Sequence, residues 1–105
     1  MTGWIRVCAR KELLPGEFQV AYDGDTAIAV FNIDGTYYAI EDVCTHDGGE
    51  LAGGPIEGFE VECLRHGARF DVRTGAATCP PAYEPTVSFP VKVEDEMVWT
   101  RDDRN

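Results

Sequence analysis

The stretch from residue 44 to residue 66 constrains this chain more than any other. It reads Cys-Thr-His over 44–46, then sixteen residues, then Cys-Leu-Arg-His over 63–66, so two short loops each offer a thiolate and an imidazole. A single zinc site usually draws its ligands in pairs that are separated by two to four residues. With one residue between Cys44 and His46, both side chains cannot easily reach one small ion, but they can reach two neighbouring ions. The spacing therefore points to a binuclear cluster.

Cys-x-His followed by Cys-x-x-His at this separation resembles the ligand signature of the Rieske family. In that family, a two-iron, two-sulfide cluster has one iron on two Cys and the other on two His. The resemblance implies one [2Fe-2S] cluster, with Cys44 and Cys63 on one iron and His46 and His66 on the other, solvent-facing iron. These are the only two histidines of the chain, so finding both at ligand offsets from a cysteine is unexpected for ordinary loop residues.

The resemblance implies an all-β Rieske fold, in which an antiparallel sandwich or barrel base carries a small inserted cluster-binding subdomain. Residue patterns favour strands at Trp4–Cys8, 18–22, 26–33 and 37–40, where Asp-Gly turns predict an antiparallel meander. No window keeps a helical period over more than two turns, so we expect little helix.

The cluster-binding subdomain is expected over about residues 43–82. Short strands at 59–63 and 69–72 would flank the second loop, and glycines at 48, 49 and 67 would let the backbone approach the cluster. By resemblance, Pro80 and Pro81 form a stiff lid over it, although an ordinary linker is the alternative. Two closing strands are predicted at 86–94 and 97–101, followed by a frayed tail at 101–105.

The length of 105 residues predicts a single domain over 1–105. That excludes a complete Rieske oxygenase, which also needs a large catalytic domain with a mononuclear iron, and leaves a carrier or a subunit. The amino terminus lacks a basic region followed by a long apolar run, so we expect no signal peptide, no membrane anchor and a cytoplasmic location. The two remaining cysteines, Cys8 and Cys79, are interpreted as buried small hydrophobes rather than a disulfide framework.

A formal charge of -10 argues against nucleic acid or anionic lipid as a partner. The charge suits a basic protein surface, or it serves solubility alone, and the composition does not separate these readings. Acidic residues recur at 57, 60 and 62 and again at 94–96, but the sequence does not show whether they share a face.

Four positions predict a low reduction potential within the family. High-potential respiratory Rieske proteins join their ligand loops by a disulfide, and the matching positions here are Gly49 and Arg65. They also place Ser and Tyr hydroxyls against cluster sulfurs, where this chain has Ala68 and Phe70. Fewer donors stabilise the reduced state less, so we expect a potential near the low end, around -150 mV.

The resemblance identifies a soluble Rieske-type ferredoxin, a one-electron carrier rather than an enzyme. It would take electrons from a flavin-dependent reductase and pass them to a terminal oxygenase through His46 or His66, and we expect it to act as a monomer. One alternative is the small subunit of an assimilatory nitrite reductase, which shares the fold, although many of those lack the four ligands. Another is a zinc-stabilised interaction module, which metal content would decide.

Overall fold

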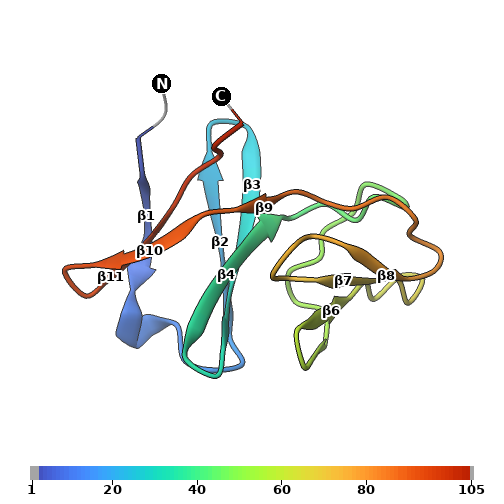
Figure 1. Ribbon diagram of the computed structural model, residues 1–105, viewed down its shortest axis with the longest axis horizontal. Helices are drawn as coiled ribbons and strands as arrows, with labels where there is room; N and C mark the ends of the chain where they lie inside the picture. Colours follow the sequence, from blue (N-terminus) through green and yellow to red (C-terminus); the bar gives the residue numbers. More distant parts are fainter. Residues whose placement is uncertain (1–2, 105) are drawn as a thin grey trace.

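The computed structural model describes residues 3–104, and within them it contains eleven strands in three antiparallel sheets and one short 3-10 helix, η1 (Arg10–Glu12) (Figure 1). The first sheet has the order β1-β11-β10, with strands at Ile5–Ala9, Met97–Thr100 and Val91–Glu94. The second has the order β2-β3-β4-β9, with strands at Phe18–Asp23, Thr26–Ile33, Thr36–Glu41 and Ser88–Phe89. The third has the order β5-β6-β7-β8, with strands at Ile56–Glu57, Glu60–Glu62, Arg69–Asp71 and Ala77–Cys79. This confirms the all-β prediction.

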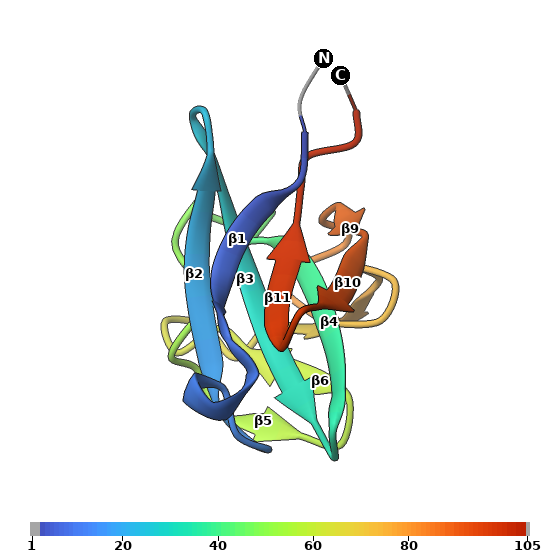
Figure 2. The same ribbon diagram turned by 90° about the vertical axis from the view of Figure 1, so that its left-hand side faces the viewer.

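Strand β3 is the centre of the molecule because both of its faces are covered. Ile28 and Val30 pack toward the first sheet in a core that includes Val98, and both are fully buried. Ala29 and Phe31 point the other way, into a core shared with the third sheet and the loops around it. Figure 2 shows the first sheet lying in front of β2, β3 and β4. Two-sided burial explains why β3 is almost continuously apolar.

The second core joins the base of the molecule to the segment between β4 and β9. Phe31 of β3 and Phe70 of β7 are both fully buried in it, together with Cys44, Cys63 and Leu51 from the loops. The third sheet and these loops lie to one side of the base sheets (Figure 1). The two candidate cysteines are therefore held by the same apolar packing that fixes the inserted segment on the base.

The predicted meander is confirmed. Strands β2 and β3 pair from Phe18↔Phe31 to Asp23↔Thr26, and β3 and β4 pair from Ile28↔Glu41 to Ile33↔Thr36. The strands flanking the second ligand loop are also present as β6 and β7. The sequence analysis did not predict β5 and β8, which are two and three residues long.

The single closing strand predicted over 86–94 was wrong. Pro90 divides it, so that β9 pairs with β4 while β10 pairs with β11 in a different sheet. Proline has no N–H to give to a ladder, and its carbonyl here accepts the Thr100 hydroxyl at 2.7 Å. Cys8 is buried as expected, but Cys79 is only partly buried.

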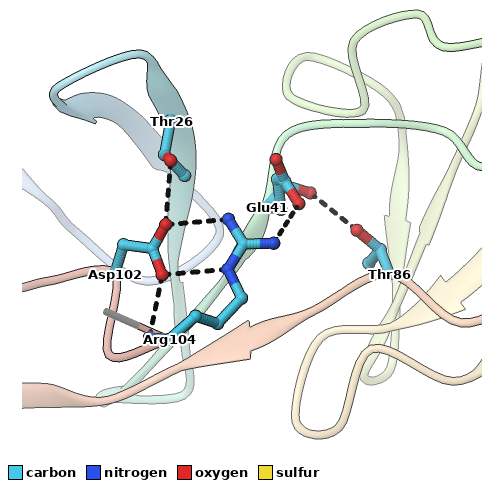
Figure 3. Close-up of polar contacts among 5 residues, drawn as sticks. All are labelled: Thr26, Glu41, Thr86, Asp102 and Arg104. Carbon is cyan, nitrogen blue, oxygen red and sulfur yellow. Dashed lines mark hydrogen bonds and ion pairs between the residues drawn. The ribbon is translucent and has the colours of Figure 1, made fainter.

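The prediction of a frayed tail was wrong for residues 101–104, while Asn105 lies outside the described residues. Asp102 is 2% exposed, and its carboxylate accepts the Thr26 hydroxyl at 2.8 Å and a two-pronged bond from Arg104 (Figure 3). Arg104 also reaches the Glu41 carboxylate at 3.3 Å. The tail thereby joins the start of β3 to the end of β4, where the chain leaves for the first ligand loop. We call this set of side chains the C-terminal clip.

None of the helical residues in the 3–104 range builds a helix long and apolar enough to span a bilayer.

Candidate metal centre

The two cysteine loops have the same backbone hydrogen bonds although their sequences differ. In each, the cysteine N–H donates to the carbonyl five residues later, and the cysteine carbonyl accepts from a glycine four residues later. Both of those glycines, Gly48 and Gly67, have φ of 78°, a conformation that other residues rarely adopt. The four bonds are Cys44 N to Gly49 O (2.7 Å), Gly48 N to Cys44 O (2.7 Å), Cys63 N to Ala68 O (2.7 Å) and Gly67 N to Cys63 O (2.9 Å).

The two thiols meet inside the protein. Cys44 and Cys63 are 0% and 1% exposed, and their Sγ atoms lie within 4.8 Å of each other. Burial raises the pKa of the Cys44 thiol, because an apolar environment disfavours the thiolate. A bound cation would supply the positive charge that the thiolates need there.

The two imidazoles meet at the surface. The rings of His46 and His66 stand edge to face with centroids 4.8 Å apart, and the His66 side chain is 51% exposed. Each loop thus sends its cysteine inward and its histidine outward. The structure brings all four predicted residues together, with a sulfur pair at the buried end and a nitrogen pair at the exposed end. This donor set fits a binuclear cluster whose two irons carry different ligands.

A carboxylate that the sequence reading missed lies between the two pairs. One Asp47 oxygen is within 4.8 Å of both thiol sulfurs, and a carboxylate oxygen is also within 4.8 Å of a ring nitrogen of each imidazole. Its Oδ2 accepts the Arg65 Nε–H at 2.7 Å, and this bond holds the pKa of the Asp47 carboxyl well below its usual range. The signal in the sequence was a pair of opposite charges beside the ligands: Asp47 directly follows His46, and Arg65 directly precedes His66.

A second acid, Asp42, fixes the first loop at its far end. Asp42 is 5% exposed, and its Oδ1 accepts the backbone N–H groups of Leu51 and Ala52, both at 2.7 Å. Asp42, which directly follows β4, therefore ties the start of the first loop to residues 51 and 52 at its end. Asp42 was not among the site residues that the sequence predicted.

The predicted proline lid lies beside the first loop. The Thr45 hydroxyl donates to the Glu84 carbonyl at 2.6 Å, which ties the segment after the two prolines to the loop. Ala82 is 4% exposed and belongs to the same core as the two cysteines. Tyr83, the next residue, is 80% exposed, and Leu64 in the second loop is 69% exposed. Two large apolar side chains thus stand at the surface, one in the second ligand loop and one in the segment that Thr45 ties to the first loop.

The positions expected to lack donors to sulfur are buried in the same core. Ala68 and Phe70 are both 0% exposed and pack with Cys44 and Cys63. Neither carries a hydroxyl. These two side chains therefore offer no hydrogen-bond donor to the cluster sulfurs, and a low potential is still expected.

The first acidic group gathers on one face, around one base. Arg69 of β7 lies 3.4 Å from Glu57, 3.6 Å from Glu60 and 3.1 Å from Glu62. The acidic residues at 94–96 lie instead at the β10–β11 turn, on the opposite side of the base from the third sheet (Figure 1). The two groups do not form one patch.

Comparisons with known proteins agree with this geometry. The family described as the Rieske [2Fe-2S] domain matches residues 3–90. The biphenyl dioxygenase ferredoxin subunit of Pseudomonas sp. (strain KKS102) is 41% identical over 95 residues, covering 89% of this chain and 86% of that protein. A structure of reduced oxygenase with oxidised ferredoxin in carbazole 1,9a-dioxygenase contains a chain that superposes with a TM-score of 0.89 at 33% identity, covering 93% of this chain and 92% of that one. A protein described as the NADH-dependent nitrite reductase small subunit of Mycobacterium tuberculosis shares the fold alone, with a TM-score of 0.83 at 19% identity and 95% coverage of each chain.

Proposed function

Because the chain belongs to the Rieske [2Fe-2S] domain family, we propose that it is the ferredoxin of an oxygenase system, carrying single electrons from a flavoprotein reductase to a terminal oxygenase. It is an electron carrier and not itself an enzyme. The observation that carries this proposal is the pair of matching loops, each with a buried thiol and an exposed imidazole.

Cys44 and Cys63 would hold one iron of a single cluster, and His46 and His66 would hold the other. The thiols come from the buried end of the site, where the apolar core excludes water, and the imidazoles come from the exposed end. When bound, a [2Fe-2S] cluster accepts and releases one electron, at a potential that its ligands and nearby hydrogen bonds set. The imidazoles would then be the shortest route for an electron between the site and a partner.

The histidine end also has the features of a contact surface for the oxygenase. Leu64 and Tyr83 are among the most exposed large apolar side chains of the described residues. Leu64 lies two positions before His66, and Tyr83 precedes Glu84, whose carbonyl accepts the hydroxyl of Thr45 next to His46. Exposed apolar groups beside a functional edge favour transient protein contact. The solved oxygenase–ferredoxin complex of the carbazole system supports an oxygenase as the partner.

The reading as a nitrite reductase subunit has less support, because that likeness extends to the fold alone while the ferredoxin relatives reach 41% identity. We further propose that the chain forms one domain and acts as a monomer. We also propose that it acts in the cytoplasm, where NADH-linked reductases operate. Size-exclusion chromatography with light scattering tests the monomer directly.

Metal and sulfide analysis, followed by electron transfer, tests the proposal. We expect about two irons and about two acid-labile sulfides per chain. The protein should be reduced by NADH only when a flavoprotein reductase is added, and should be reoxidised by a ring-hydroxylating oxygenase. Zinc without labile sulfide would overturn the proposal in favour of a zinc-stabilised module, and tight binding to a sirohaem protein would restore the nitrite reductase reading.

A further inference from the structure

Arg65 lies across the gap between the two ligand loops. It belongs to the second loop, but its guanidinium donates to the first: Nε donates to Asp47 Oδ2 at 2.7 Å, and Nη2 donates to Asp47 Oδ1 at 3.2 Å and to the Glu50 carbonyl at 3.1 Å. A guanidinium fork on a carboxylate fixes orientation as well as distance. One side chain of the second loop thus makes three hydrogen bonds to two residues of the first, Asp47 and Glu50.

Gly49 makes this crossing possible. A Cβ built at Gly49 would overlap the Arg65 guanidinium at Nη2, Cζ and Nε. The φ of Gly49 is not in the left-handed region, so its backbone is open to other residues. The lack of a side chain at Gly49 therefore leaves the space that the Arg65 guanidinium occupies, whereas the backbone conformation at this position does not itself call for glycine. Its N–H also donates to Asp47 Oδ1 at 2.9 Å, which turns the carboxylate toward the guanidinium.

We propose that Arg65, Asp47 and Gly49 form a charge latch that clamps the two ligand loops and positions His46 and His66. Gly49 and Arg65 match the two positions at which high-potential Rieske proteins carry a disulfide between the loops; here the Arg65 guanidinium lies over Gly49 and forms an ion pair with Asp47 of the same loop. Unlike a disulfide, this link does not depend on the redox state of thiols. It does weaken as salt screens the charges, since the Arg65 side chain is 41% exposed.

The latch inference rests on the proposed cluster, but it predicts a specific pattern among variants. Arg65→Ala removes the crossing side chain and leaves its space empty. Gly49→Ala keeps both charges and both loops but places a methyl group where the guanidinium lies. We expect either substitution to speed cluster loss about fivefold, the effect of losing a partly exposed but two-pronged ion pair. The double variant should behave like Arg65→Ala alone, because the three atoms nearest to the added methyl all belong to the Arg65 side chain, which the double variant lacks.

The experiment follows the decay of visible absorbance of the iron-loaded protein in the presence of an iron chelator, at low and at high salt. Gly3→Ala is the matched control for the glycine, because a Cβ at Gly3 has no neighbour within 4 Å. Arg10→Ala is the control for the charge, because Arg10 forms an ion pair with Glu96 at 3.4 Å and is 47% exposed. Both controls should lose the cluster at the wild-type rate. High salt should reduce the difference in the rate of cluster loss between the wild type and Arg65→Ala.

A positioning role also predicts a spectroscopic change that a general loss of stability would not give. The low-temperature EPR signal of reduced Arg65→Ala and Gly49→Ala should broaden in the same way, because the two histidines are held less uniformly. The latch is refuted if Gly49→Ala holds the cluster as long as Gly3→Ala, or if the effects of Arg65→Ala and Gly49→Ala multiply in the double variant. Should the wild-type protein contain zinc, the proposed function fails, and the same variants test the latch through zinc release to a chromogenic chelator.

Discussion

Removing the Asp42 carboxylate should destabilise the protein at the first ligand loop. Asp42 is 5% exposed, and its Oδ1 accepts two backbone N–H groups at 2.7 Å, one of them from Leu51, which is 1% exposed. Asp42→Ala leaves both donors without their acceptor inside a packed core. Asp42→Asn keeps a carbonyl oxygen on the side chain but removes its charge.

The expected magnitude follows from those two bonds. A hydrogen bond to a charged group contributes about 1.5–3 kcal/mol to stability, so the lower end for two bonds gives about 3 kcal/mol for Asp42→Ala. A change of 1 kcal/mol shifts the melting temperature of a domain of this size by about 4–8 °C, so 3 kcal/mol predicts a loss of roughly 12–24 °C. Asp42→Asn should lose about half as much, because two neutral hydrogen bonds remain possible.

The assay is thermal unfolding of the iron-loaded protein at one fixed scan rate, recorded by circular dichroism and by visible absorbance. Asp103→Ala is the control, because it removes the same charge from an exposed position near the chain end. The cluster absorbance of Asp42→Ala should bleach at or before the loss of β-structure, since the substitution acts on a ligand loop. A melting temperature within about 2 °C of the Asp103→Ala value would refute the structural role of Asp42.

Three further predictions concern the C-terminal clip, the potential and the contact surface. Arg104 holds the pKa of Asp102 below its usual range, so the clip stabilises the protein above about pH 4 and loses that effect as the pH falls through the lowered pKa. Urea unfolding should therefore show Asp102→Asn less stable than wild type at pH 7, with the gap closing below about pH 4, and a constant gap would contradict this. Ala68→Ser should raise the midpoint potential by about 40 mV, the equivalent of one hydrogen bond of about 1 kcal/mol for a one-electron couple, and an unchanged potential in a redox titration would contradict it. Leu64→Asn with Tyr83→Ser should slow electron transfer to the oxygenase in stopped-flow mixing without moving the potential, and equal rates would place the contact surface elsewhere.

The sequence predicted the parts of this fold that local patterns control. The Asp-Gly turns and the alternating runs were sufficient for β2, β3 and β4, because turn chemistry and side-chain period act over a few residues. Strand β8, at 77–79, was not predictable in this way, since its pairing with β7 depends on tertiary placement. The same holds for the tail, where buried Asp102 binds Thr26, a residue 76 positions away in the sequence.

The same distinction between local patterns and tertiary contacts applies to the site. Ligand spacing was enough to single out the two Cys-His loops, which the structure brings together at one place. The residues that hold those loops in register were not visible, because Asp42, Asp47 and Arg65 are joined to partners between 9 and 18 positions away in the sequence. At Gly49 the sequence reading expected close approach of the backbone to the cluster, whereas the structure gives its lack of a side chain another use, in making room for Arg65.

Low-temperature EPR of the protein before and after reduction with dithionite tests the central claim most directly. Ligation of one iron by Cys44 and Cys63 and of the other by His46 and His66 predicts a silent oxidised form and a reduced form with a rhombic signal. The average g of that signal should lie clearly below that of all-cysteine [2Fe-2S] clusters. An average g equal to that of all-cysteine clusters, or a colourless and EPR-silent protein that contains zinc, would contradict the mixed ligation on which the electron-carrier function depends.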